Sequence, residues 1–136
     1  MNQHYNRRYS KEEIGAILQI IQTCVCDGKY TIARNQNRQE NLELIREYNL
    51  TTKKLQRILL QIETKDFCHS LQNIKVGYEH ETLYVFCPQV TLSNFDNEER
   101  LVDIYLKFNI VNIGTESRVI VISFHERKRS IDYLFR

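Results

Sequence analysis

The chain has 136 residues, 42% of them hydrophobic and 26% charged, which is typical of one folded domain with its own core. No run of about 18 apolar residues is present, so a transmembrane helix is not expected, and the polar first residues lack the apolar core of a signal peptide. A formal net charge of +2 does not by itself indicate nucleic-acid binding. We expect a cytoplasmic protein without a membrane partner, with a flexible tail over residues 1–9 and a single domain over residues 10–136.

The first half of the chain predicts three helices, each with apolar residues at helical spacing. Ser10 and Glu13 form a capping-box pattern, in which each side chain can bond the backbone amide of the other residue, and Gly28 ends the helix that follows. Asn37 is a suitable N-cap for a second helix, and Thr51 for a third.

The second half of the chain predicts an antiparallel sheet. After one more helical turn at residues 64–70, a strand over residues 82–91 contains Pro88, which favours a sheet edge or a bulge. Two longer strands, Val102–Ile110 and Arg118–Glu126, follow and are joined by a hairpin turn. Helices followed by strands predict an α+β fold in which the N-terminal helices pack on a C-terminal antiparallel sheet.

The two long strands carry polar residues of a predicted site. In the first strand, Tyr105 and Lys107 lie on the face opposite an apolar row. The second strand is apolar on both faces over Val119–Ile122, which predicts a central strand covered on both sides. Strict alternation then places His125 on the same face as Val119.

Cations follow the second strand directly, and together with the strand residues they suggest a phosphate-binding site. A histidine in a strand is more often structural, and tyrosine and lysine can belong to an ordinary solvated face. Metal-free RNA cleavage, however, needs groups of this kind: a base for the 2′-hydroxyl, an acid for the departing 5′ oxygen, and positive charge around the phosphorus. The predicted residues are His125, Tyr105 and Lys107 for the chemistry, and Arg127, Lys128 and Arg129 for RNA binding.

The four cysteines do not predict a metal site. Cys24 and Cys26 are two positions apart on the first helix, where their side chains face about 200° from each other. Cys68 and Cys87 show no zinc-knuckle spacing. We expect buried thiols and no metal or other cofactor.

Four short segments resemble, in order and spacing, the MqsR family of bacterial toxins. These toxins are mRNA interferases of type II toxin–antitoxin systems and have a RelE-like α+β fold. The resemblance covers roughly residues 55–126, and the N-terminal helices fit less closely. The segments are Asp66–Ser70, Leu83–Phe86, Ile104–Phe108 and Ile120–Glu126.

The resemblance implies roles for individual residues. Tyr105 matches the functional tyrosine of the family in its Tyr-Leu-Lys segment. His125 and His69 stand where better-known members have lysines, in Ser-Phe-Lys-Glu and Asp-Phe-Tyr-Lys-Ser respectively. Histidine transfers protons at neutral pH more readily than lysine, so these replacements are compatible with cleavage. The functional glutamine of the family has no clear equivalent, because Tyr84 or Val85 falls at its place.

The resemblance therefore implies a bacterial or phage-borne, metal-independent endoribonuclease that cleaves single-stranded mRNA by attack of the 2′-hydroxyl and is inhibited by a cognate antitoxin. His125 is expected to be the main acid or base, with Tyr105, Lys107 and His69 also in the chemistry, and Tyr84 stacking a base. The expected partners are mRNA and the antitoxin; participation of the ribosome is left open. The alternative is a non-catalytic RNA- or protein-binding regulator of a phage or mobile element on the same fold, which the low net charge and the replaced lysines favour.

Overall fold

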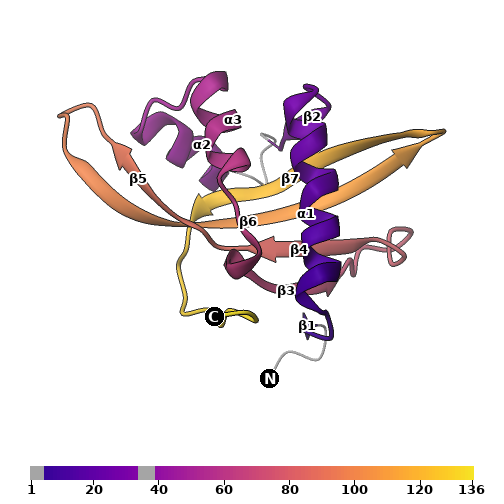
Figure 1. Cartoon of the computed structure of the whole chain (residues 1–136). Helices are drawn as coiled ribbons and strands as arrows, with labels where there is room; N and C mark the ends of the chain where they lie inside the picture. Colours follow the sequence, from indigo (N-terminus) through magenta and orange to yellow (C-terminus); the bar gives the residue numbers. More distant parts are fainter. Residues whose placement is uncertain (1–4, 34–38) are drawn as a thin grey trace.

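The computed structural model describes residues 5–33 and 39–136. These residues form a mixed α+β fold with three α-helices, a 3₁₀ turn and seven strands in one sheet, which confirms the predicted fold class (Figure 1). The helices are α1 (Lys11–Cys26), α2 (Gln39–Glu47) and α3 (Thr52–Leu60), and the 3₁₀ turn is η2 (Thr64–Asp66). The strands are β1 (Tyr5–Asn6), β2 (Tyr30–Ile32), β3 (Phe67–Gln72), β4 (Thr82–Phe86), β5 (Gln89–Ser93), β6 (Glu99–Ile113) and β7 (Glu116–Glu126).

The sheet has the strand order β1-β3-β4-β6-β7-β2, and β5 pairs with the first part of β6. Neighbouring strands are antiparallel except at one edge, where β2 runs parallel to β7. The strands from the second half of the chain are therefore antiparallel, as predicted, and the parallel pairing is made by β2, which comes from the first half. Strand β6 lies between β4 and β7, and β7 lies between β6 and the short strand β2, which pairs only with residues 119–121.

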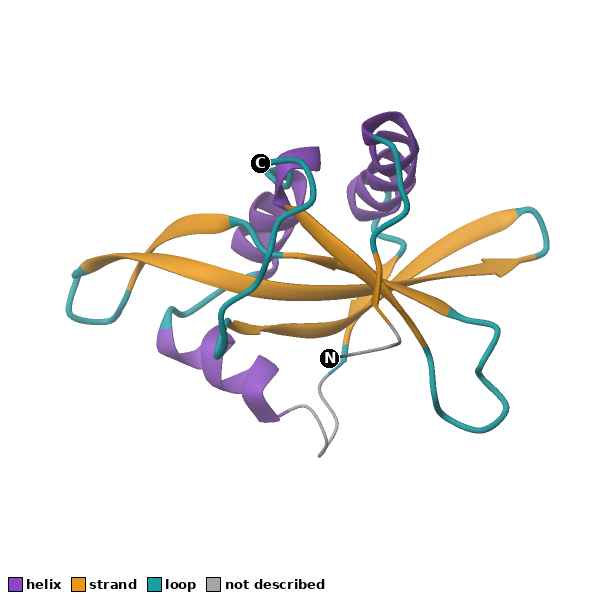
Figure 2. Cartoon of the chain, turned by 90° about the horizontal axis from the view of Figure 1, so that it is seen from below, coloured by secondary structure: helices purple, strands orange, loops and turns teal. Residues whose placement is uncertain are grey.

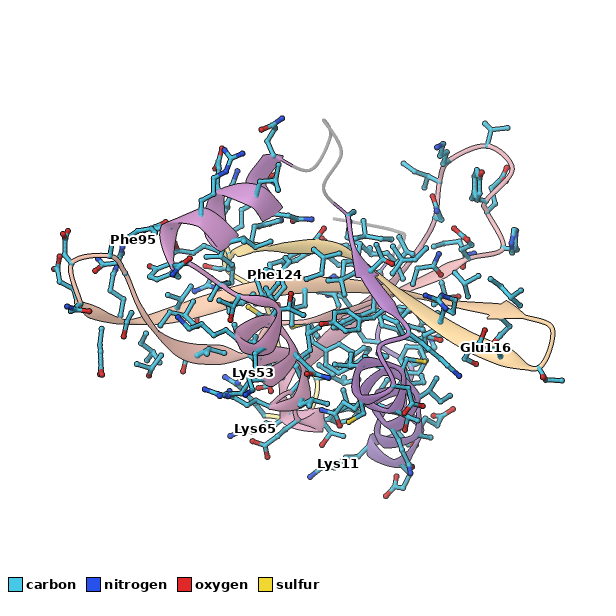
Figure 3. All side chains as sticks on the ribbon, turned by 90° about the horizontal axis from the view of Figure 1, so that it is seen from above. Lys11, Lys53, Lys65, Phe95, Glu116 and Phe124 are labelled. Atoms are coloured by element: carbon cyan, nitrogen blue, oxygen red, sulfur yellow. The ribbon has the colours of Figure 1, made fainter. Side chains whose placement is uncertain are left out.

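The helices begin where their capping residues predict. Ser10 and Glu13 form the reciprocal capping box of α1, and the Thr51 hydroxyl accepts a hydrogen bond from the Lys54 amide at the start of α3. Helix α1 packs on β7 and on α3, α2 packs on β7, and buried apolar residues of all three helices belong to the main core (Figure 2). Phe124 of β7 lies inside this main core, and Phe95 stands exposed at the end of the β5–β6 hairpin (Figure 3).

Strand β3 is an element that the sequence did not predict. Residues 67–70 were expected to continue a helical turn, but the helical turn ends at Asp66 and these residues are extended. The expected strand over residues 82–91 is divided into β4 and β5 at Pro88, which has no backbone N–H for a ladder. The Pro88 carbonyl still accepts a hydrogen bond from the Ile104 amide at 2.9 Å.

A β-bulge in β7 shifts the alternation of side chains by one position. Residues after the bulge therefore lie on the opposite face from the one that strict alternation predicts. Lys107 pairs with Ser123 while the next residue of β6 pairs with Val121, so Ile122 is an extra residue. As a result, Val121 and Phe124 both lie in the main core. Ser123 and His125 face the other side of the sheet.

Two expectations for β7 are wrong, the first of them because of this bulge. His125 does not share a face with Val119; it lies on the opposite side of the sheet from it. The segment Val119–Ile122 is not covered on both faces either, because Ile120 is 37% exposed.

Residues 5–9 also differ from the expected flexible tail. Tyr5–Asn6 pairs with β3, and the Tyr9 hydroxyl lies 2.8 Å from the Ser70 hydroxyl. Tyr9 also packs against the main core. The rest of the predicted tail, residues 1–4, and the predicted N-cap Asn37 lie outside the described residues.

The C-terminal segment, residues 127–136, crosses the sheet without forming a strand. The Tyr133 hydroxyl donates to the Cys87 carbonyl at 2.7 Å, and the Arg136 guanidinium pairs with the Asp66 carboxylate at 2.9 Å. Ile131 and Tyr133 pack on a small second cluster of buried residues, while Leu134 and Phe135 pack against the main core. Nowhere in residues 5–33 and 39–136 is there a helix long and apolar enough to span a membrane.

Candidate active site

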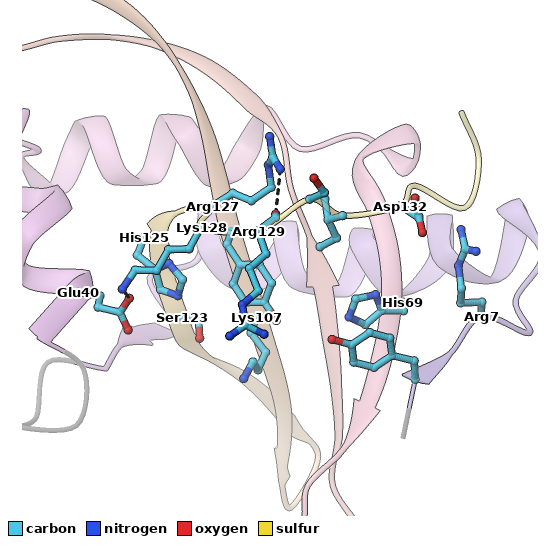
Figure 4. A pocket seen from close by; sticks show the side chains of 14 residues that line it. Arg7, Glu40, His69, Lys107, Ser123, His125, Arg127, Lys128, Arg129 and Asp132 are labelled. Atoms are coloured by element: carbon cyan, nitrogen blue, oxygen red, sulfur yellow. Dashed lines mark hydrogen bonds and ion pairs between the residues drawn. The ribbon is translucent and has the colours of Figure 1, made fainter. Parts of the chain in front are cut away.

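A cavity of about 510 Å³ lies on the face of the sheet opposite the main helical core. It gathers all four residues predicted for the chemistry and the three cations that follow β7. His125, with Glu40 and Lys128, lies at one end of this cavity, and His69, with Arg7 and Asp132, lies at the other (Figure 4). The predicted residues that line it are His69, Tyr105, Lys107, His125, Arg127, Lys128 and Arg129.

Tyr105 and His125 are direct partners across β6 and β7, and their rings stack. The His125 Nδ1 atom lies 3.0 Å from the Glu126 carbonyl oxygen. Because a carbonyl can only accept, Nδ1 carries the proton in the neutral imidazole. The Nε2 atom then has a free lone pair, which is the form that a general base needs.

A row of side chains on the same face connects the two ends of the cavity. Ser123 pairs with Lys107, Lys107 with Val85, and Val85 with His69 across four neighbouring strands. Strands in a sheet are about 4.8 Å apart, so the backbones of Lys107 and His69 are separated by roughly 10 Å. The floor of the cavity is therefore a rigid part of the sheet.

Tyr105 stays protonated under ordinary conditions. Burial raises the pKa of its hydroxyl to about 12, with smaller contributions from Tyr5, Cys68 and Cys87. At neutral pH the hydroxyl is therefore a hydrogen-bond donor and not a base.

His69 is buried at the other end, under the ring of Tyr5. The two rings stack with their centroids 3.9 Å apart and their planes at 13°. Burial, with the nearby charges of Arg7 and Lys107, lowers the pKa of His69 to about 4, so the imidazole is neutral at pH 7. Its Nε2 atom has no hydrogen-bond partner among the described residues.

Two of the cations beside His125 are held by carboxylates. The Arg127 guanidinium pairs with Asp103 at 3.1 Å and donates to the Arg129 carbonyl at 2.8 Å. Lys128 forms an ion pair with Glu40 of α2. The cavity lining as a whole has five basic and two acidic side chains, which favours an anionic ligand.

Helix α2 is attached to β7 by one buried amide. The Asn41 side chain donates to the carbonyls of Ala33 and Ile122 at 2.8 and 3.0 Å and accepts from the Phe124 amide at 2.7 Å. It thus takes the place of a neighbouring strand at the point where β2 ends. This contact positions Glu40 at the cavity and supports the strand segment that carries His125.

Tyr84 is the one predicted site residue that does not line the cavity. It pairs with Phe108, packs against the main core and contacts the ring of Tyr9, with the centroids 6.3 Å apart. Alternation along β4 directs Val85 to the cavity side instead. The expectation that Tyr84 stacks an RNA base is therefore wrong in this fold.

Several cavity residues were not found from the sequence. Tyr5 and Arg7 belong to a segment with no apolar periodicity and a strand of two residues, so no local pattern marks them. Glu40 and Asp132 are ordinary surface-type residues that reach the site through the packing of α2 and the C-terminal segment. Only the tertiary structure brings them together.

The cysteines are all free, and Cys24, Cys68 and Cys87 are buried as expected, whereas Cys26 is exposed. Burial raises the pKa of the Cys68 thiol to about 12, which makes it a poor nucleophile at neutral pH. Within the part of the chain that the structure describes, no three His, Cys, Asp or Glu residues are grouped so that they could hold a metal ion.

Comparison of the chain with protein-family models, with curated proteins and with solved structures gives no match. The chemistry of the cavity is therefore the guide to function. Its defining features are a positioned imidazole, a protonated tyrosine and an excess of positive charge.

Proposed function

We propose that the protein is a metal-independent endoribonuclease that cleaves single-stranded mRNA, an mRNA-interferase toxin of the MqsR type with a RelE-like fold, inhibited by a cognate antitoxin. The observation that carries the proposal is the placement of His125. Its Nδ1 atom is tied to the Glu126 carbonyl, and its ring lies on Tyr105 in a cavity with an excess of basic side chains.

The reaction begins with His125 as the base. Nε2 removes the proton of a 2′-hydroxyl, and the resulting oxygen attacks the adjacent phosphorus. Lys107, two residues from Tyr105 on the same face of β6, stabilises the charge that develops on the phosphate oxygens. The Tyr105 hydroxyl donates a proton to the departing 5′ oxygen. The products are a 2′,3′-cyclic phosphate and a 5′-hydroxyl.

His69 has a different position from the one expected for a second proton-transfer residue. It is covered by Tyr5, about two strand spacings from Lys107, and its pKa of about 4 keeps it neutral at pH 7. A buried, neutral imidazole at this distance is poorly suited to exchange protons with the 2′-hydroxyl or with the departing 5′ oxygen.

The test is incubation of the pure protein with a long messenger RNA in excess EDTA. We expect discrete cuts with 2′,3′-cyclic phosphate ends and a loss of about 10²–10⁴ in rate for His125→Ala, the usual contribution of acid–base catalysis. His80→Ala is the matched control, because His80 is exposed in the turn before β4 and does not line the cavity. Equal cleavage by wild type and His125→Ala would contradict the assignment of the base.

The alternative is a non-catalytic RNA- or protein-binding regulator. The ion pairs of Arg127 with Asp103 and of Lys128 with Glu40 favour it, since a phosphate must compete with these carboxylates. Intact RNA in every tube, and again in the presence of ribosomes, would support this second function and contradict the first.

A further inference from the structure

The end of the cavity away from His125 has features that cleavage itself does not use. Tyr5 of β1 lies flat on His69 and is still 48% exposed, so one side of its ring faces the open cavity. Arg7 and Asp132 lie beside this pair (Figure 4). An exposed aromatic ring with a charged rim is the usual platform for a base of single-stranded RNA.

The imidazole beneath Tyr5 is not explained by packing alone. His69 is 4% exposed, and its Nε2 has no partner within residues 5–33 and 39–136. A phenylalanine would offer the same flat ring to Tyr5 without leaving a buried polar atom unbonded. Nε2 has almost no solvent-accessible surface, so it is not open to a ligand in the cavity, and the case for ligand binding here rests on the Tyr5 ring and the charge beside it.

Positive charge is present at the same place. Lys107 and Arg7 are close enough to His69 for both charges to lower its pKa. The Arg7 Nε atom donates to the Cys68 carbonyl at 3.3 Å, which holds its guanidinium beside β3. A sugar–phosphate backbone at this edge would meet the Arg7 guanidinium, which lines the cavity beside Tyr5.

We propose that this end of the cavity is a nucleotide subsite, in which the base of a nucleotide next to the cleaved bond stacks on Tyr5. The exposed Arg7 guanidinium at the rim pairs with a phosphate of that nucleotide. The roughly 10 Å between the backbones of His69 and Lys107 separates this subsite from the reacting phosphate. The position next to the cleaved bond rests on the proposed nuclease function.

Binding is measured separately from cleavage with a fluorescent single-stranded oligonucleotide carrying 2′-O-methyl groups, which lack the attacking hydroxyl. We expect Tyr5→Ala to raise Kd about 5- to 150-fold, as for loss of one stacked base, and Tyr5→Phe to stay within about twofold. Tyr78→Ala is the control, because Tyr78 is similarly exposed but does not line the cavity. His69→Phe, which keeps the ring under Tyr5, is expected to leave Kd within about twofold of wild type.

An abasic position scanned along the oligonucleotide identifies the stacked base. At one position its removal should weaken binding to wild type but not to Tyr5→Ala, because both changes delete the same contact. Unchanged binding by Tyr5→Ala would overturn the subsite, whether or not RNA is cleaved. Tyr5-dependent binding without any cleavage would instead retain the subsite and overturn the nuclease.

Discussion

The ring of Tyr105 lies nearly parallel to the imidazole of His125, with the centroids 5.2 Å apart and the planes at 15°. Since the two residues also face each other across β6 and β7, the pairing of the strands fixes the direction of the imidazole. The proposed catalysis by His125 should therefore depend on the tyrosine ring as well as on its hydroxyl.

Substitutions of Tyr105 separate these two contributions. Tyr105→Phe keeps the stacked ring and removes the proton donor, so we expect the single-turnover cleavage rate to fall about 10²-fold. Tyr105→Ala should lower the cleavage rate by about a further 2- to 12-fold, because it also removes the stabilisation of an aromatic pair. If Tyr105→Phe cleaves as fast as wild type, the hydroxyl is not the acid.

Stability at alkaline pH should also depend on Tyr105. Its pKa is raised by burial to about 12, above the ordinary value, so the unfolded chain loses this proton first as the pH rises. The free energy of unfolding must then fall between about pH 10 and 12. Urea titrations across this range should show a smaller fall for Tyr105→Phe, and an identical fall would disprove the shift.

His69 should limit stability at acidic pH. Its pKa is lowered to about 4 by burial and by the charges of Arg7 and Lys107, so between about pH 6.5 and 4 the unfolded state binds more protons. The stabilisation is present above pH 6.5 and is lost as the pH falls through this window. His69→Phe should remove this loss and, because it deletes an unbonded polar atom, raise the stability at pH 7 by about 1 kcal/mol. The exposed His80→Ala should change neither quantity.

Asn41 should be one of the most sensitive positions outside the cavity. Asn41→Leu leaves three backbone groups of Ala33, Ile122 and Phe124 without their partner, and we expect a loss of about 3 kcal/mol or more. Chemical denaturation measures this loss, with Glu43→Ala on an exposed face of α2 as the control. A change below about 1 kcal/mol would show that water replaces the amide.

The C-terminal segment should depend on the contact of Arg136 with Asp66. The Asp66 carboxylate is almost fully buried and also accepts from the Glu63 amide at 2.8 Å. Arg136→Ala leaves this charge without its cation, and we expect about 1–3 kcal/mol of destabilisation because the arginine is partly exposed. Thermal unfolding measures this loss. In the same experiment Lys65→Ala, which breaks the exposed ion pair with Glu63, should lower the free energy of unfolding by less than about 1 kcal/mol.

Much of the fold could be predicted because local chemistry determines it. The capping residues Ser10 and Thr51 begin their helices as predicted, and the alternation around Tyr105 and Lys107 gives the correct face of β6. The β3 strand could not be found in this way. Its residues 67–70 are buried on both faces, partly by Tyr5 and the C-terminal segment, so no alternation remains in the sequence.

The candidate site was predicted in composition but not in geometry. His125 and its following cations do line one cavity with Tyr105, yet the face of β7 was wrong because a bulge leaves no signature in an apolar run. The prediction that Tyr84 lies in the site was wrong for a related reason. The face on which Tyr84 lies depends on which residue of β6 it pairs with.

The extra residue Ile122 shifts the alternation of β7 by one position, so the core side chains are Val119 and Val121 before it and Phe124 after it. Before it, changes at buried positions such as Val119 and Val121 should lower the melting temperature. The activity of the molecules that remain folded should not change. After it, changes at His125 should leave melting unaltered and remove function. Deletion of Ile122 would remove the bulge and leave a regular alternation in which Val121 and Phe124 still face the core and His125 still pairs with Tyr105, so the strand should tolerate this deletion better than the deletion of a paired residue.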